Sequence, residues 1–161
     1  MENNATNIDP IALKNANAWL EGNYDNDTKD AIRQMIANNP EEVTESFYRN
    51  LEFGTGGLRG IMGIGTNRMN KYVVAMATQG LANYVIKNFK ESKPLKAAVA
   101  HDSRINSKEF ARIVAEVFAA NGFEVCLFDD LRPTPELSFA IRYYKCQTGV
   151  NITASHNPKE Y

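Results

Sequence analysis

The stretch Ala97-Ala98-Val99-Ala100-His101 decides the fold, because a short apolar run of this kind forms a buried strand. Two similar runs follow, at residues 123–128 and 148–152. Apolar residues at helical spacing separate the three runs, over residues 108–121 and 135–145. Strands that alternate with helices in this way predict an α/β fold, here a three-layer α/β/α sandwich around a largely parallel (mixed) sheet.

Residues that start and stop helices support this pattern. Ser107 is expected to cap the helix that follows it, and Gly122 to end that helix. Upstream, Asn70 is expected to cap a long helix over residues 71–89.

The first fifty residues have a different, helical character. Asp9-Pro10 and Asn39-Pro40 are typical helix starts, and residues 28–37 carry a further apolar face. We therefore expect a helical N-terminal extension over residues 1–50, packed on a main domain over residues 51–161.

Composition limits the classes of function. The formal net charge of −1 offers no broad basic surface for nucleic acid, and no apolar run approaches the length of a membrane span. The polar N-terminus lacks the design of a secretion signal. Cys126 and Cys146 lie in or beside apolar segments without metal-ligand spacing, so we expect reduced thiols in a cytoplasmic protein.

Three loops follow the predicted strands: Asp102-Ser103-Arg104, residues 129–134, and Thr153-Ala154-Ser155-His156-Asn157-Pro158. Ligands of open α/β sheets bind beyond the carboxyl ends of the strands, so these loops are the candidate site. We call residues 153–158 the serine loop.

Ser155 and His156 have two interpretations. Adjacent side chains usually point in different directions, and Ser-His-Asn-Pro is also rich in turn formers, so the pair alone fits a surface turn. Its position at a strand's carboxyl end favours a functional hydroxyl.

The segment Gly54-Thr55-Gly56-Gly57-Leu58-Arg59-Gly60 also has two interpretations. It matches neither a dinucleotide fingerprint nor a phosphate-binding P-loop. Free backbone N–H groups and a guanidinium suit a phosphate, whereas the alternative is a tight hairpin with an exposed arginine.

The remaining candidates favour structural roles. Asp102 fits a carboxylate that braces a loop better than one that faces a ligand. His101 fits a packed residue at a strand end, and Arg132-Pro133-Thr134-Pro135 fits a rigid loop that could also line the cleft.

Taken together, Phe-Gly-Thr-Gly-Gly-Leu-Arg-Gly at residues 53–60, Asp-Ser-Arg at 102–104 and Thr-Ala-Ser-His-Asn-Pro at 153–158 resemble the α-D-phosphohexomutase superfamily of phosphoglucomutases and phosphomannomutases. The resemblance runs from about Leu51 to the end of the chain. The helical extension and residues 62–70 resemble the branch of long phosphoglucomutases and phosphopentomutases.

This resemblance implies a role for each matching residue. Ser155 would carry the transferable phosphoryl group, and its phosphate would be a metal ligand, with His156 beside it for proton transfer or positioning. Arg59 would contact the reacting phosphate, and Arg104 would support the serine loop. Thr55, Gly56, Gly57 and Asn157 would complete the substrate- and phosphate-binding set.

The resemblance also implies groups outside this chain. Mg²⁺ would bridge the phosphoserine to aspartates of a later domain, and later domains would bind the sugar and its distal phosphate. The chain would then be most of the first domain of a four-domain enzyme, inactive in isolation.

The implied reaction moves a phosphoryl group between the C1 and C6 (or C5) hydroxyls of a phosphosugar, with glucose 1,6-bisphosphate as intermediate and activator. The expected substrate pair is glucose 1-phosphate and glucose 6-phosphate. Phosphomannomutase, phosphopentomutase, hexose-bisphosphate synthase and a non-catalytic sugar-phosphate-binding relative remain as alternatives.

Overall fold

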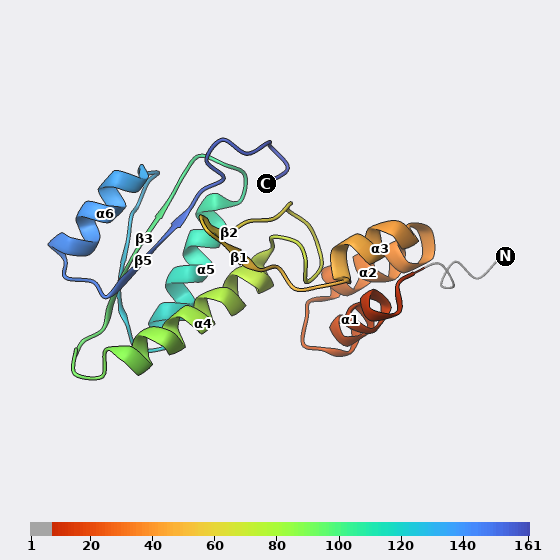
Figure 1. Ribbon diagram of the computed structural model, residues 1–161, viewed down its shortest axis with the longest axis horizontal. Helices are drawn as coiled ribbons and strands as arrows, with labels where there is room; N and C mark the ends of the chain where they lie inside the picture. Colours follow the sequence, from red (N-terminus) through yellow and green to blue (C-terminus); the bar gives the residue numbers. More distant parts are fainter. Residues whose placement is uncertain (1–7) are drawn as a thin grey trace. The chain divides into compact units, whose positions relative to one another are not determined.

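The computed structural model describes residues 8–161 and divides the chain into two compact units (Figure 1). The first reaches Asn70 and includes Glu160 and Tyr161, and the second runs from Lys71 to Lys159. The expected boundary at residue 50 separates a helical extension from a domain, whereas these two units are defined by the contacts within each of them. The expected boundary therefore stays a prediction.

Three helices build most of the first unit: α1 (Pro10–Glu21), α2 (Asn26–Asn38) and α3 (Pro40–Phe47). Each begins where a side chain accepts a hydrogen bond from an otherwise unpaired N–H group of the first turn. Asp9, Asp25 and Asn39 are these caps. The Asp9-Pro10 and Asn39-Pro40 starts are confirmed, while α2 begins two residues before the expected Thr28 because Asp25 caps it.

The three helices bury a small apolar core between them. The indole of Trp19 meets the ring of Phe47 edge-on, with 5.5 Å between ring centroids. The core residues are Ala12, Ala16, Trp19, Ile32, Val43 and Phe47.

A short hairpin follows the helices. Its strands, β1 (Phe53–Gly54) and β2 (Gly57–Leu58), pair antiparallel, so Thr55 and Gly56 form the turn. Gly57 has φ +103°, a backbone conformation that favours glycine.

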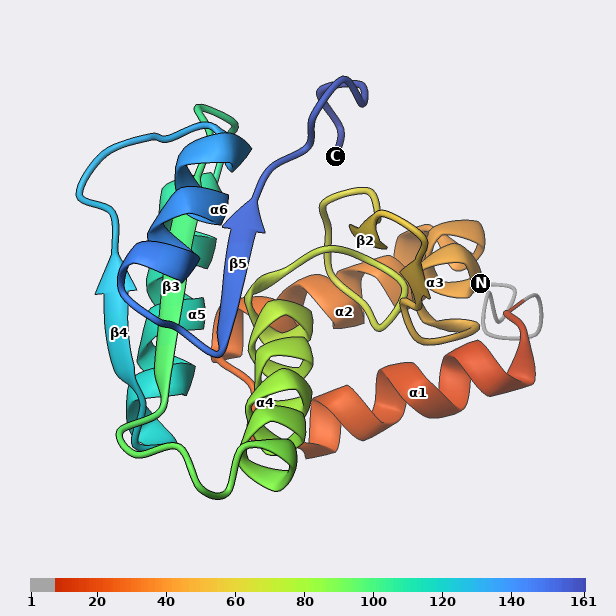
Figure 2. The ribbon, with the colours of Figure 1, turned by 60° about the vertical axis from the view of Figure 1, so that its left-hand side comes forward.

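A parallel three-stranded sheet forms the second unit, in the order β4-β3-β5. The strands are β3 (Lys96–His101), β4 (Glu124–Leu127) and β5 (Thr148–Ile152). Figure 2 shows the three arrows running in one direction, so their carboxyl ends share one edge of the sheet.

Helices cover both faces of this sheet. In both ribbon views, α5 (Ser107–Ala120) lies on one face and α6 (Thr134–Tyr143) on the other, and α4 (Lys71–Asn88) packs against α5. This arrangement confirms the predicted α/β/α architecture.

The sheet face beneath α6 has an apolar core that includes both cysteines. Ala98, Ala100 and Leu137 pack beneath α6 together with the partly buried Cys126 and Cys146, which are free thiols. Burial raises the pKa of Cys146 to about 11, and the neighbouring Cys126 adds to that rise.

Several predicted boundaries differ from the structure. The expectation that Ser107 caps α5 is wrong, because Ser107 is the first helical residue and Asn106 stands at the cap position with φ 65°. The strand predicted over residues 123–128 is shorter, at Glu124–Leu127. The helix predicted to reach Lys145 ends at Tyr143, before Lys145 adopts φ 56°.

Candidate active site

The serine loop leaves the carboxyl end of β5 as a tight turn. The Asn157 N–H donates to the Ala154 carbonyl at 2.9 Å, and the Ser155 N–H donates to the Thr153 hydroxyl at 3.0 Å. Ser155 lies within this turn with φ 52°, in the left-handed region that few non-glycine residues adopt. Such a conformation persists only where surrounding contacts hold it.

The structure brings the Ser155 and His156 side chains together. Ser155 Oγ lies 3.3 Å from His156 Nδ1, and both residues are exposed. In an extended chain adjacent side chains point to opposite sides, and the left-handed backbone at Ser155 breaks this alternation. The geometry therefore allows a proton to pass between the hydroxyl and the imidazole.

Arg104 braces the serine loop from the loop after β3. Its guanidinium donates to three carbonyls, at 3.1 Å to Ser155, 2.6 Å to Asn157 and 3.2 Å to Pro158. A planar fork of donors suits this arrangement better than a single ammonium would. Arg104 thus contacts the serine loop directly. Its expected roles in supporting a phosphoserine and in binding phosphate stay predictions.

Asp102 ties the serine loop to the start of α5. Its Oδ1 accepts from the Arg104 N–H at 2.9 Å and from the Ser107 hydroxyl at 2.6 Å, and its Oδ2 accepts from the Ala154 N–H at 3.1 Å. Partial burial acts to raise the pKa of Asp102. Hydrogen bonds from these groups and from Thr153 outweigh burial, so the pKa lies below its usual value. The loop-bracing interpretation is confirmed.

The other strand-end residues have structural contacts. His101 is buried, and its Nδ1 lies 2.9 Å from the Asp102 carbonyl, an acceptor to which the ring must donate. Arg132 donates its N–H to the His101 carbonyl at 3.0 Å and pairs with Glu136 at 3.3 Å. Both fit the packed, rigid roles inferred from the sequence.

The glycine-rich candidates belong to the first unit. Thr55, Gly56 and Gly57 form the β1–β2 turn and the start of β2, and Arg59 follows as an exposed residue. A Cβ built on Gly56 would lie 2.7 Å from Arg59 Nη2, so the guanidinium covers the turn. Among residues 8–161 this guanidinium has neither a hydrogen bond nor an ion pair, and the hairpin with an exposed arginine is therefore present.

Comparison with known proteins places these features in a family. Residues 50–161 match the model of phosphoglucomutase/phosphomannomutase, alpha/beta/alpha domain I. The chain belongs to the phosphoglucomutase/phosphomannomutase family. The predicted superfamily is thereby confirmed.

Named relatives agree with the family. Human phosphopentomutase is 38% identical over 149 residues, 88% of this chain and 24% of that protein. A Staphylococcus epidermidis phosphoglucomutase is 39% identical over 145 residues, 90% of this chain and 26% of that protein. A probable phosphoribomutase of Schizosaccharomyces pombe is 36% identical over 155 residues, 96% of this chain and 26% of that protein. The chain thus spans about a quarter of the length of these relatives, and no solved structure matches it significantly.

The part of the phosphomutase domain that the structure describes has no cluster of three or more His, Cys, Asp or Glu side chains able to hold a metal ion. None of the helices over residues 8–161 is long and apolar enough to cross a membrane.

Sequence reasoning missed some functional contacts of this domain. It assigned Ser107 only a helix-capping role, and it named Thr153 only as the first residue of the Thr-Ala-Ser-His-Asn-Pro motif. Both hydroxyls serve the Asp102 carboxylate. Ser107 lies five positions after Asp102 and Thr153 lies 51 positions after it, so no local pattern links the two hydroxyls to this carboxylate.

Proposed function

We propose that this chain is the phosphoserine-bearing first domain of a phosphosugar mutase. The parent enzyme would move a phosphoryl group between the C1 and C6 (or C5) hydroxyls of one sugar, most simply glucose 1-phosphate and glucose 6-phosphate. The observation that carries this proposal is the exposed Ser155 hydroxyl 3.3 Å from His156, on a loop braced by Arg104. The family and its named relatives support the reaction class.

In this reaction Ser155 acts as the covalent carrier. The bond between phosphorus and Ser155 Oγ breaks as a bond from phosphorus to the sugar hydroxyl oxygen forms. The net proton movement is from the sugar hydroxyl to Ser155 Oγ, so the step is balanced. His156 Nδ1 is close enough to deliver that proton to Oγ and to remove it in the return step through glucose 1,6-bisphosphate.

Charge around the moving phosphate would come from Arg59. Its exposed guanidinium has no described protein partner, so it is free to bind phosphate oxygens. N–H groups of Thr55, Gly56 and Gly57 would assist, and Asn157 would contribute from the serine loop. Phosphoryl transfer depends mainly on such positioning and charge.

Mg²⁺ would neutralise charge on the phosphate when bound. The phosphate of Ser155 would be one ligand. The described residues hold no cluster of three or more potential ligand side chains, so the other ligands would come from later domains of the same polypeptide. The isolated 161-residue chain should therefore show no turnover with glucose 1-phosphate. Two free cysteines support a cytoplasmic location for the parent enzyme.

A pentose phosphate is the alternative substrate, because two of the named relatives are a phosphopentomutase and a probable phosphoribomutase. The ratio of kcat/KM for glucose 1-phosphate to that for ribose 1-phosphate distinguishes the two substrates.

Phosphopeptide mapping of the full-length protein tests the central claim. After incubation with glucose 1,6-bisphosphate, a phosphate should appear on Ser155. Ser155→Ala should lose both label and turnover, and Ser103→Ala, an exposed serine in the loop beside Arg104, should keep both. A fully active Ser155→Ala enzyme would end the proposal.

A further inference from the structure

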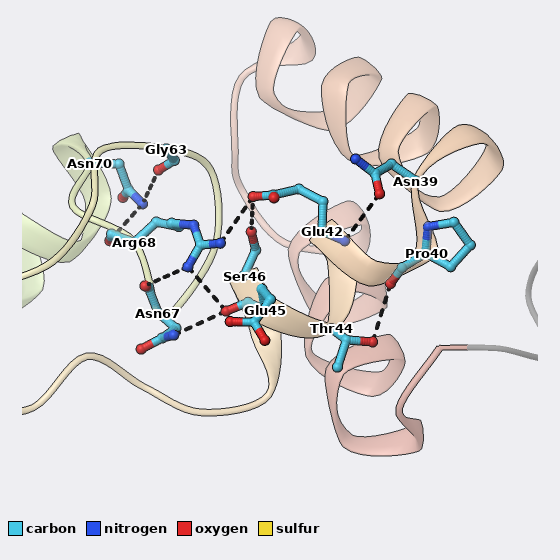
Figure 3. Close-up of polar contacts among 10 residues, drawn as sticks. All are labelled: Asn39, Pro40, Glu42, Thr44, Glu45, Ser46, Gly63, Asn67, Arg68 and Asn70. Atoms are coloured by element: carbon cyan, nitrogen blue, oxygen red, sulfur yellow. Dashed lines mark hydrogen bonds and ion pairs between the residues drawn. The ribbon is translucent and has the colours of Figure 1, made fainter. Parts of the chain in front are cut away.

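The C-terminus of α3 is capped by residues of a distant segment of the first unit, residues 65–69. The helix has no basic residue in its last turn, so its final carbonyls need partners from elsewhere. The Asn67 side chain donates to the Glu45 carbonyl at 3.0 Å, and the Asn67 N–H donates to the Ser46 carbonyl at 2.9 Å. Arg68 also donates to the Glu45 carbonyl, at 3.2 Å (Figure 3). A guanidinium at this end favourably meets the helix dipole.

Arg68 adds an ion pair to this cap. Its other terminal nitrogen lies 3.1 Å from Oε1 of Glu42, one turn earlier in α3, and that oxygen also accepts from the Ser46 hydroxyl at 2.9 Å. The Arg68 side chain is 11% exposed and that of Glu42 is 44% exposed, so solvent screens this pair somewhat less than a fully exposed pair. The close-up shows the guanidinium reaching from its loop to both acceptors (Figure 3).

Gly65 permits the close approach of the loop to the helix. Its φ is +132°, and a Cβ there would lie 2.3 Å from the Ser46 carbonyl oxygen. A backbone atom cannot move aside as a flexible side chain can, so only glycine fits.

The same segment holds both ends of the hairpin that carries Arg59. Before the hairpin, the Leu51 N–H donates to the Thr66 carbonyl at 2.8 Å. After it, the Met69 N–H donates to the Ile61 carbonyl at 2.9 Å. Backbone hydrogen bonds therefore connect both ends of the hairpin to the segment that caps α3.

We propose that Arg68 is a positioning residue for the reaction: by fastening residues 65–69 to α3, it fixes the hairpin that presents Arg59. The N-terminal helices, through α3, thus hold that hairpin in place. This inference rests on the proposed function only in giving Arg59 a catalytic task. The fastening itself is independent of the reaction.

A double-mutant cycle in the full-length enzyme tests the proposal. Arg68→Ala should lower kcat by about tenfold to a hundredfold, because a displacement of about 1 Å at a reacting centre can cost up to about a hundredfold. The kcat of Arg68→Lys should lie between those of Arg68→Ala and the wild type, since one ammonium cannot bind both Glu42 and the Glu45 carbonyl. The matched control is Arg33→Ala, which removes an exposed arginine–aspartate pair of α2 and should leave kcat unchanged.

The decisive comparison uses the Arg59→Ala background. If Arg68 acts through Arg59, adding Arg68→Ala to Arg59→Ala should change kcat less than twofold. Multiplied losses would instead show an independent, merely structural effect and would overturn the inference. If Arg59→Ala alone keeps wild-type kcat, the proposed role of Arg59 fails, and the positioning role falls with it.

Hydrogen exchange read by mass spectrometry gives a readout that does not depend on activity. In Arg68→Ala, and in Gly65→Ala as a second variant, amides of residues 51 and 69 should exchange about tenfold faster or more, with little change in α1. Unchanged exchange at these amides in both folded variants would overturn the fastening and, with it, the proposal.

Discussion

The Asp102 carboxylate connects the loop after β3 and the serine loop to the start of α5. Replacing Asp102 by asparagine leaves only one of its two acceptor oxygens. The carboxylate accepts from the Ser107 hydroxyl and the Arg104 N–H on one oxygen, and from the Ala154 N–H on the other. Thr153 supplies a further hydrogen bond. Asparagine keeps the shape but turns one oxygen into an NH₂ group, which cannot accept. Whichever way the amide turns, donors on one side lose their partner.

The expected loss follows from these contacts. A hydrogen bond to a charged group is worth about 1.5–3 kcal/mol. Asp102 is only partly buried, so water replaces some of that loss and the lower value applies to each bond. One or two lost bonds then amount to about 1.5–3 kcal/mol, which for a unit of this size lowers Tm by about 6–24 °C.

Urea and thermal unfolding measure this loss, and a matched exposed aspartate serves as the control. Asp130→Asn makes the same chemical change at a carboxylate whose described contact is the N–H of the next residue, so it should shift stability by under about 0.5 kcal/mol. An Asp102→Asn protein as stable as Asp130→Asn would refute the bracing role.

The pH dependence of unfolding supplies a second check on Asp102. Its pKa is lower in the folded protein than in the unfolded chain, where an aspartate titrates near ~3.9. The stabilisation is therefore complete above the unfolded value and is lost as pH falls through the folded value. The stability gap between wild type and Asp102→Asn should narrow below about pH 4.

The remaining predictions concern single contacts of the second unit. Arg104→Ala should speed amide exchange in the serine loop about tenfold with little change in global Tm, and lysine should restore it only in part, because one ammonium cannot reach three carbonyls. Gly149→Ala should destabilise by about 1–3 kcal/mol in urea unfolding, because its Cβ would lie 2.4 Å from a δ-carbon of Ile141, whereas Gly80→Ala, in open space within α4, should stabilise by about 0.5–1 kcal/mol. Cys146, with its pKa raised to about 11, should be alkylated by iodoacetamide at pH 8 at least about tenfold more slowly than in urea, as read by peptide mapping; equal rates would contradict the burial.

The regular elements could be predicted because their determinants are local. Apolar spacing marks β5 at Thr148–Ile152 without error, and Asp9-Pro10 and Asn39-Pro40 mark two helix starts, since each cap acts within one turn. The error at Ser107 has the opposite origin. A serine before a helix usually caps it, but this hydroxyl bonds to Asp102, whose position depends on the sheet.

The candidate site was predictable in location but not in its internal contacts. Parallel strands bring their carboxyl ends to one edge, which was enough to select the serine loop and Asp102-Ser103-Arg104. The bonds between them join residues about 50 positions apart in the chain, so no local pattern encodes them. The contact between Arg68 and Glu42 of α3 could not be predicted for the same reason, because the two residues are 26 positions apart.

The serine loop and the hairpin that carries Arg59 are held in the same way, by residues other than Ser155 and Arg59 themselves. Ser155 has a backbone conformation that costs about 1–3 kcal/mol, so a turn left to itself would relax away from it. Bonds from Arg104 and Asp102 on either side of Ser155 oppose that relaxation while leaving its hydroxyl exposed. Arg59 likewise stays unpaired because residues 66–69, rather than its own guanidinium, hold the hairpin. In both loops the groups that fix the backbone differ from the side chains that we propose take part in the reaction. Loss of a bracing residue should therefore change catalytic geometry without removing any reacting atom.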